Sequence, residues 1–180
     1  MKRKLFVAIN LPEDIKRNLV KKTNKWTDLP VRWARQEKLH FTLAFLGYID
    51  DQKIPEIIET LREAVDQNGS FELNFDTIQP GPDRLDPKMI WLTGSTSPEL
   101  VNLHEKVGRA IGFLVRNHKR FRPHITLGKV RRKLLAEQNI PIEIKQPFPV
   151  SFPVYSIELM SSELSEEGSE YLILESLKLE

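Results

Sequence analysis

The sequence predicts an α+β fold in which two similar lobes of mainly antiparallel strands form a central cleft, with helices packed outside. Three observations support this prediction. Short strand-like apolar segments alternate with amphipathic helical segments along the chain. One series of these segments recurs after 84 residues. No Pro-, Gly- or Ser-rich linker interrupts the 180 residues, so we expect a single bilobal domain over residues 1–180.

The strands are indicated by apolar runs and by apolar residues in alternation. We expect them at residues 5–9, 40–48, 71–75, 89–92 and 124–130. Residues 154–159 and 171–177 form a hairpin around Glu167 and Gly168 in this interpretation. The Gln-Pro-Gly-Pro segment at 79–82 predicts a turn.

Three helices are expected between these strands. Pro12 suits the first position of a helix that places Ile15, Leu19 and Trp26 on one face. An amphipathic helix over residues 54–65 ends near Asn68-Gly69. The third helix has its apolar stripe between residues 100 and 111, with Thr96 or Ser97 near its N-terminal cap.

The recurring series consists of a strand, a helix, a His-bearing strand and a further strand. With the offset of 84, residues 5–8 align with 89–92 and residues 40–43 align with 124–127. The alternating positions 71, 73 and 75 align with 155, 157 and 159, whereas the helix at 54–65 has no equally good counterpart. We infer two lobes related by an approximate two-fold axis, each contributing one His-bearing strand to a shared centre.

Both His-bearing strands have the pattern His-apolar-Thr-Leu. The two copies are His40-Phe41-Thr42-Leu43 and His124-Ile125-Thr126-Leu127. Because successive side chains of a strand point to opposite faces, each histidine shares a face with its threonine, and the apolar residues face the core. The two lobes would then present two imidazoles and two hydroxyls to one cleft. One such strand is ordinary, but two at the offset of a longer repeat indicate a functional site.

Composition excludes several kinds of site. The chain has no cysteine, which excludes a disulfide scaffold, thiol catalysis and Cys-ligated metals. No apolar run approaches the roughly 20 residues of a membrane span, and the stretch before Asn10 is too short for a secretory signal. We therefore expect a cytoplasmic protein without membrane attachment. Neither motif is accompanied by a carboxylate or a third histidine, so no metal is expected.

The net charge of +2 conceals a segregation of charge along the chain. No acidic residue occurs between Lys106 and Ala136, while that stretch holds ten bases: Lys106, Arg109, Arg116, Lys119, Arg120, Arg122, Lys129, Arg131, Arg132 and Lys133. Such a stretch creates a positive field that attracts a polyanion, although solvated loop and helix faces would give the same pattern.

Other candidate residues carry weaker signals. His104 suits a partly exposed position on a helix. His118 suits a surface position in the basic stretch, with RNA contact as the alternative. Three aromatic residues suit either the core or the stacking of a terminal base, namely Phe6, Trp33 and Phe45. Arg122 and Arg131 flank the second motif, and strand alternation favours Arg122 because it is in phase with His124.

Five segments make the chain resemble the 2H phosphoesterase superfamily, and within it the RNA 2′,3′-cyclic phosphodiesterases, also called 2′-5′ RNA ligases. They are LFVAINLP, RWARQEKLHFTLAFLG, IWLTG, FRPHITLGKVR and SSELSEEGSEYLILESL, and they span nearly the whole chain. The paired His-x-Thr-x motif defines that superfamily. The resemblance implies a 2H phosphoesterase-like fold, a monomer, and an RNA substrate that ends in a 2′,3′-cyclic phosphate, with tRNA fragments as one candidate.

The resemblance also implies roles for the motif residues. His40 would donate a proton to the departing 3′ oxygen and His124 would accept one from water, giving a 2′-phosphomonoester. The residues themselves do not fix which histidine does which. Thr42 and Thr126 would donate hydrogen bonds to the phosphate. Lys129, where arginine is common in the family, and Arg122 would add contacts to it. No cofactor is needed, and the reverse reaction with a 5′-hydroxyl would form a 2′-5′ linkage.

Two other interpretations are compatible with the sequence. In one, the basic stretch makes an RNA-binding module and the histidines are inert, but such binding needs charge and stacking rather than two matched titratable groups. In the other, a related 2H enzyme acts on small cyclic nucleotides or 2′-5′ oligonucleotides. No GxxxxGK[ST] motif for a nucleoside triphosphate is present.

Overall fold

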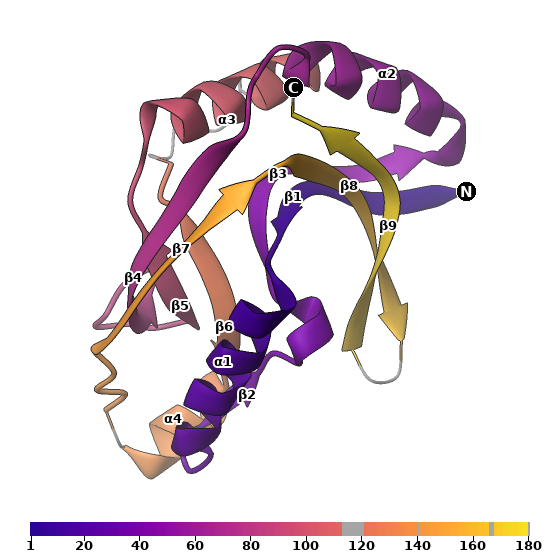
Figure 1. The fold of residues 1–180 in the computed structure, drawn as a ribbon. Helices are drawn as coiled ribbons and strands as arrows, with labels where there is room; N and C mark the ends of the chain where they lie inside the picture. Colours follow the sequence, from indigo (N-terminus) through magenta and orange to yellow (C-terminus); the bar gives the residue numbers. More distant parts are fainter. Residues whose placement is uncertain (113–120, 140, 166–167, 180) are drawn as a thin grey trace.

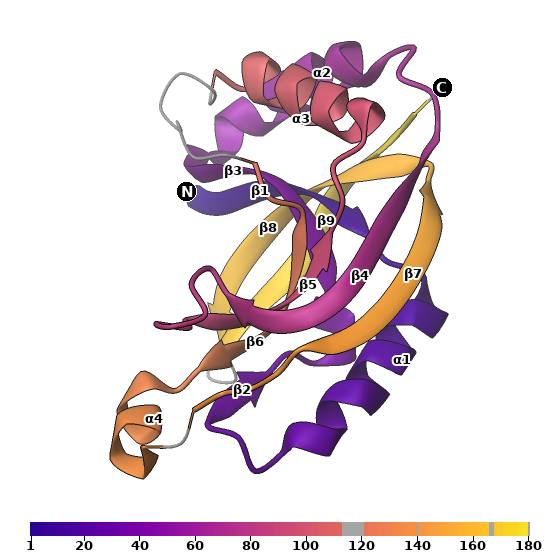
Figure 2. The ribbon, with the colours of Figure 1, turned by 90° about the vertical axis from the view of Figure 1, so that its left-hand side faces the viewer.

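The computed structural model describes residues 1–112, 121–139, 141–165 and 168–179. In this part of the chain one strongly curved antiparallel sheet of nine strands carries helices outside it (Figures 1 and 2). Helices α2 and α3 lie together at one end of the sheet, and α1 and α4 lie toward the opposite end.

The sheet has the strand order β7-β4-β5-β6-β3-β1-β8-β9, and β2 pairs with β6. The strands are β1 (Lys2–Asn10), β2 (Val31–Trp33), β3 (His40–Asp50), β4 (Phe71–Gly81), β5 (Met89–Gly94), β6 (His124–Val130), β7 (Gln146–Val154), β8 (Ser156–Ser165) and β9 (Gly168–Lys178). Four strands of this path lie on each side of the β3–β6 contact, and this arrangement confirms the predicted two-lobed α+β fold.

The two halves of the strand path correspond to the offset of 84 residues. Adding 84 takes β1, β3 and β4 onto the ranges of β5, β6 and β8. Strand β4 follows β3 along the chain but pairs with β5, and β8 pairs with β1 in the corresponding way, so each lobe contains strands from both halves of the sequence. The internal repeat stays a prediction, which this strand order supports.

Among the described residues the α-helices are α1 (Glu13–Thr23), α2 (Ile54–Val65), α3 (Pro98–Ala110) and α4 (Arg132–Gln138). Helix α3 begins as expected, because the Ser97 hydroxyl oxygen accepts a hydrogen bond of 3.1 Å from the Leu100 N–H. Helix α4 was not predicted from the sequence. It is short, and its residues pack against the core mainly through Leu135.

Three details of the sequence prediction are wrong. Residues 79–81 belong to β4 rather than to a turn, because Gln79, Pro80 and Gly81 continue the ladder with β5. Trp26 lies beyond the end of α1 in a 3₁₀ turn, where its ring packs against that of Trp33. Val154 ends β7 instead of starting the hairpin of β8 and β9. Of the two residues around which this hairpin was expected, Gly168 begins β9 and Glu167 lies outside the described residues.

The core lies between the sheet and the helices, and strand β1 is buried on both faces. Leu5, Val7 and Ile9 face the main core, whereas Phe6 and Ala8 join a second cluster with Met160 on the cleft side. Burial on both faces explains why residues 5–9 read as a continuous apolar run. None of the described helices has the length and apolar character needed to cross a membrane.

Candidate active site

The two motif strands meet at the centre of the sheet. Strands β3 and β6 are antiparallel, and their register pairs Phe41 with Ile125. Both side chains are buried in the main core, with exposed fractions of 1% and 0%. Since strand side chains alternate, the histidine and the threonine on either side of each of these residues project to the other face of the sheet.

This register brings the four polar motif side chains together. Because the strands are antiparallel, the neighbours on the two sides of the Phe41–Ile125 pair also lie opposite each other: His40 beside Thr126, and Thr42 beside His124. All four side chains line the same cleft, which has a volume of about 510 Å³. The two halves of the sheet therefore contribute equivalent pairs to one site.

Each histidine is oriented by the same backbone contact. His40 Nδ1 lies 2.8 Å from the carbonyl oxygen of Lys38, and His124 Nδ1 lies 2.8 Å from that of Arg122. A carbonyl oxygen accepts only, so Nδ1 carries the proton in both rings. Proton transfer to or from a bound ligand is therefore left to Nε2 in both rings, as an acceptor when the ring is neutral and a donor when it is charged.

His40 lies in an aromatic part of the cleft. Its ring centre is 5.1 Å from that of Phe6 and 5.0 Å from that of Tyr171, which meets it edge-on. Burial lowers the pKa of His40 below its ordinary value. The hydrogen bond to the Lys38 carbonyl raises this pKa, and the nearby Lys16 ammonium lowers it again. Lys16 is itself buried and is held 2.8 Å from a Glu13 carboxylate oxygen.

His124 lies against an indole instead. Its ring stacks on Trp91 with 3.9 Å between the ring centres, and the Arg122 guanidinium lies 5.2 Å from the centre of the same indole. Burial lowers the pKa of His124, and the charge of Arg122 adds to this effect, while the Arg122 carbonyl opposes it. The indole face attracts a cation, so it favours the imidazolium that forms when His124 takes up a proton.

Trp91 has its position because β4 carries a glycine beside it. A Cβ atom at Gly81 would lie 2.5 Å from Cε3 of the indole, far inside van der Waals contact. A second glycine, Gly128, lines the cleft, where a Cβ atom would come within 2.6 Å of Val31 Cγ1 on β2. Both glycines therefore permit close packing beside the motif strand β6.

The wall of the cleft is basic. The described lining residues include five cationic side chains and no carboxylate: Lys4, Arg32, Arg35, Lys38 and Lys129. Such a wall favours an anionic ligand. Of these five, Lys129 alone comes from the acid-free stretch that the sequence singled out, part of which, residues 113–120, lies outside the described residues. Most of the positive charge comes from β2 and the segment leading into β3.

The structure places the other sequence candidates as follows. Phe6, Trp33 and Phe45 line the cleft, as does Lys129. Arg122 lies outside the cleft lining, in a neighbouring pocket, because Pro123 and the start of β6 at His124 interrupt the strand alternation assumed for it. Arg131 lies outside the cleft lining as well.

The remaining histidines are separate from this site. His104 is partly exposed on α3, as expected, and it joins α3 to β3, since its Nδ1 donates to the Leu43 carbonyl oxygen at 3.0 Å and its ring stacks on Phe121. His118 lies outside the described residues. In the described part of the chain no three His, Cys, Asp or Glu side chains gather as a metal site would require.

Sequence reasoning did not single out Tyr171, Trp91 or the basic side chains of residues 32–38. Tyr171 reaches the cleft from the last strand, and burial raises the pKa of its hydroxyl. The sequence does carry a signal for the basic side chains, because three bases occur within seven residues just before the first motif: Arg32, Arg35 and Lys38. This short cluster is not visible when charge is counted over longer stretches.

Comparison with known proteins gives the family. The model of the 2′-5′ RNA ligase superfamily matches residues 14–166, which include both motifs. The chain belongs to the 2′-5′ RNA ligase superfamily. A Thermotoga maritima member named RNA 2′,3′-cyclic phosphodiesterase is 28% identical over 97% of this chain and 95% of its own length. An Archaeoglobus fulgidus member of the same name is 30% identical over 72% of this chain and 74% of its own length.

Two solved structures have the same fold. A crystal structure from Thermus thermophilus has a TM-score of 0.82 at 24% identity, covering 98% of this chain and 97% of that one. The structure of E. coli LigT complexed with 3′-AMP has a TM-score of 0.80 at 23% identity, covering 99% of both chains. At these identities the likeness shows the fold.

Proposed function

We propose that the protein is an RNA 2′,3′-cyclic phosphodiesterase, which hydrolyses a terminal 2′,3′-cyclic phosphate to a 2′-phosphomonoester without a metal. The observation that carries this proposal is the convergence of His40, Thr42, His124 and Thr126 on one basic cleft. The relatives named RNA 2′,3′-cyclic phosphodiesterase support the choice of substrate.

The proposed reaction uses the two imidazoles in opposite senses. His124 Nε2 takes a proton from water as the water oxygen attacks phosphorus, and His40 Nε2 gives a proton to the departing 3′ oxygen. Thr42 and Thr126 donate hydrogen bonds to the nonbridging oxygens, where negative charge accumulates. Lys129 lines the cleft and adds positive charge to it.

The stack of His124 on Trp91 supports this division of roles. Burial and a neighbouring cation, Lys16 beside His40 and Arg122 beside His124, lower the pKa of both histidines and favour the neutral rings before a ligand binds. The anionic cyclic phosphate would promote the imidazolium of His40, because a nearby negative charge raises an imidazole pKa. Trp91, for its part, stabilises the imidazolium that His124 becomes as it takes up the proton of water.

The bound RNA would place its terminal base against the aromatic side of the cleft. Phe6 and Tyr171 lie against His40, and the ring centre of Phe6 is 6.2 Å from that of Phe45 and 5.3 Å from that of Tyr171. Base stacking on such rings is tolerant of sequence. Arg32 and Arg35 would contact the backbone of the RNA. We include tRNA fragments among the substrates, and we propose a cytoplasmic monomer made of one bilobal domain with an internal repeat.

The proposal is tested by following an RNA that ends in a 2′,3′-cyclic phosphate, in the presence of EDTA. We expect the wild-type protein to give the 2′-phosphate, and His40→Ala to be slower by about 10²- to 10⁴-fold, the usual effect of losing a general acid or base. His104→Ala is the matched control, because His104 lies outside the cleft lining. Loss of activity in EDTA, or a wild-type rate for His40→Ala, would contradict the proposal.

A further inference from the structure

Strand β3 carries two exposed aromatic side chains beyond its catalytic motif. Phe45 is 54% exposed and lines the catalytic cleft, and Tyr48, three residues further along the strand, is 69% exposed. The proposed reaction gives Tyr48 no role. A single exposed tyrosine is ordinary on a protein surface, so its position relative to the cleft decides what it can bind.

The pairing of β1 with β3 puts Tyr48 on the face of the sheet that forms the cleft. In a regular strand residues 45 and 48 would face opposite sides. Here the register shifts by one residue between them, at a bulge that includes Gly47 with a φ of 78°. Phe45 therefore pairs with Phe6. Tyr48 pairs with Lys4, which itself lines the cleft, and paired residues project to the same side of a sheet.

Lys4, Phe45 and Tyr48 thus form an outer strip, which continues the aromatic side of the cleft outward. Lys4 is two residues from Phe6 on β1, or about 7 Å at the usual rise of a strand, and its side chain is exposed. The strip is therefore one step beyond the surface proposed for the terminal base. Strand β3 then ends at Asp50, whose carboxylate would repel a phosphate, so the strip has room for one nucleotide.

The shape of the substrate directs the RNA chain toward this strip. In a ribose 2′,3′-cyclic phosphate, the base on C1′ and the C5′ carbon on C4′ both project from the face of the ring opposite the cyclic phosphate. We place that phosphate between His40 and His124 and the base against Phe6. The 5′ oxygen then lies on the side of the base, away from the histidines, and the preceding nucleotide continues from there.

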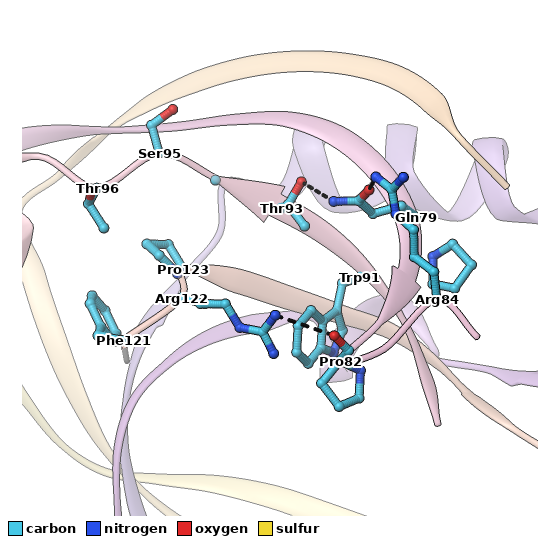
Figure 3. A pocket seen from close by; sticks show the side chains of 12 residues that line it. Gln79, Pro82, Arg84, Trp91, Thr93, Ser95, Thr96, Phe121, Arg122 and Pro123 are labelled. Carbon is cyan, nitrogen blue, oxygen red and sulfur yellow. Dashed lines mark hydrogen bonds between the residues drawn. The ribbon is translucent and has the colours of Figure 1, made fainter. Parts of the chain in front are cut away.

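The side of the site beyond His124 offers no such continuation. Trp91 stacks on His124, and among the described residues the pocket on the other side of Trp91 shares no lining residue with the cleft. In that pocket the Arg122 guanidinium lies beside the indole and donates a hydrogen bond to the Pro82 carbonyl oxygen (Figure 3). The preceding nucleotide therefore has to leave the cleft on another side.

We propose that Tyr48 stacks on the base of the nucleotide that precedes the cyclic-phosphate end, with Lys4 beside the phosphate that joins the two nucleotides. This inference rests on the proposed function. Stacking on an aromatic ring accepts any base, and a lysine meets the phosphate as a point charge. The strip would thus favour RNA ends over small cyclic nucleotides without a preference for sequence.

Two substrates that differ by one nucleotide test this assignment. Adenosine 2′,3′-cyclic phosphate lacks the preceding nucleotide, and the dinucleotide ApA ending in a 2′,3′-cyclic phosphate has it. We expect the wild type to show a kcat/KM about tenfold higher or more on the dinucleotide, which corresponds to the stacking of one base. Tyr48→Ala should lose most of this preference, while its hydrolysis of the mononucleotide stays within about twofold of wild type.

Two further variants serve as controls. Tyr48→Phe keeps the ring and should keep the preference for the dinucleotide. Tyr155→Ala is the matched control, because Tyr155 is 64% exposed and lies outside the cleft lining. An equal loss on both substrates in Tyr48→Ala would overturn the inference, because Tyr48 would then shape the cleft itself. An unchanged preference would also overturn it, as expected if Tyr48 met another protein instead.

A cross-link locates the preceding base directly. The ligand is an RNA that ends in a 2′-phosphate, the product of the proposed reaction, with 5-iodouridine as its next-to-last nucleotide. It should photo-cross-link to the peptide containing Tyr48 in the wild type and in Tyr155→Ala, and much less in Tyr48→Ala. Cross-links to residues 32–38 instead would overturn the inference. A wild-type protein that leaves both cyclic phosphates intact would contradict the proposed function, and the cross-link would still decide for the strip.

Discussion

Phe41 and Ile125, the residues that follow the two motif histidines, face each other across the contact between β3 and β6. Both side chains are fully buried in the main core. Because successive side chains of a strand alternate, this burial directs the preceding histidines to the opposite face of the sheet. The same pair thus joins the two halves of the sheet and orients the histidines. The ring of Phe41 packs further against Phe75 and Phe121, at centre distances of 6.0 and 6.3 Å. The geometry of the site thus depends on the packing behind it.

Removal of the Phe41 ring should therefore reduce stability strongly. Phe→Ala substitutions in a core cost about 3–5 kcal/mol, because they remove buried surface and leave a cavity. We expect Phe41→Ala to lower the free energy of unfolding by this amount in a urea titration. Phe45→Ala is the control: Phe45 lies four residues further on the same strand and is 54% exposed. An equal loss in the two variants would show that the β3–β6 pair has no special role in the core.

Gly81 should control the position of His124 through Trp91. A methyl group at residue 81 would lie 2.5 Å from Cε3 of the indole, so Gly81→Ala has to displace the ring on which His124 stacks. Misplacement of a catalytic group by about 1 Å can cost on the order of 10²-fold in rate, so we expect Gly81→Ala to hydrolyse cyclic-phosphate RNA about 10²-fold more slowly.

A second substitution checks that the clash is the cause. The atoms close to the added methyl are Cδ2, Cε3 and Cζ3, which all belong to the six-membered ring of the indole. Trp91→Phe replaces the indole with a smaller ring and relieves the clash. The double variant Gly81→Ala, Trp91→Phe should therefore be faster than Gly81→Ala alone. A double variant that is slower still would point to a different effect of the methyl group.

Lys16 should shift the pH range in which His40 is protonated. Burial is the main cause that lowers the pKa of His40, and the charge of Lys16 lowers it further, so Lys16→Met should raise that pKa and keep the imidazolium to higher pH. If His40 is the acid, the basic limb of the kcat/KM profile then moves to higher pH, and an NMR titration of His40 moves in the same direction. Lys21→Met is the control, on an exposed position of the same helix. An unchanged titration would contradict the electrostatic role of Lys16.

The sequence predicts the motif strands and their faces because strand alternation is a local rule. This rule is enough to place His40 on the same face as Thr42 and His124 on the same face as Thr126. The repeat then predicts that the two pairs lie in one cleft, as the structure shows. Strand β7 was not predicted, since prolines at 147, 149 and 153 weaken any strand pattern. Strand β7 lies at the edge of the sheet and has a neighbouring strand on one side only. Proline has no N–H to donate, and on the unpaired side of an edge strand no hydrogen bond is lost, so the prolines are tolerated.

The parts of the site that were missed depend on long-range packing. Trp91 lies within the expected strand at residues 89–92, and its contact with His124 depends on the room that Gly81 leaves on another strand. Arg122 was assigned to the phosphate by strand phase, but the strand begins after it, and its side chain turns to the neighbouring pocket. Neither relationship can be obtained from spacing along the chain.

Binding of a long RNA should depend on salt through the basic wall of the cleft. For single strands, log K falls with log salt with a slope of about −0.7 for each phosphate neutralised. Arg32 lines the cleft, so Arg32→Ala should reduce that slope by about 0.7. Arg17→Ala, on an exposed position of α1, should leave it unchanged. An affinity that does not vary with salt would exclude backbone contacts beyond the terminal phosphate.

The roles of the two histidines can be separated with an activated leaving group. A p-nitrophenolate departs without protonation, so a diester that carries it needs the base but not the acid. We expect His40→Ala to recover much of its activity on this substrate and His124→Ala to remain slow, although both lose about 10²- to 10⁴-fold on cyclic-phosphate RNA. Rescue of His124→Ala instead would exchange the roles, and rescue of neither would make the imidazoles charged ligands of the phosphate. Because groups that act as a unit are not additive, the double variant should be little worse than the slower single variant.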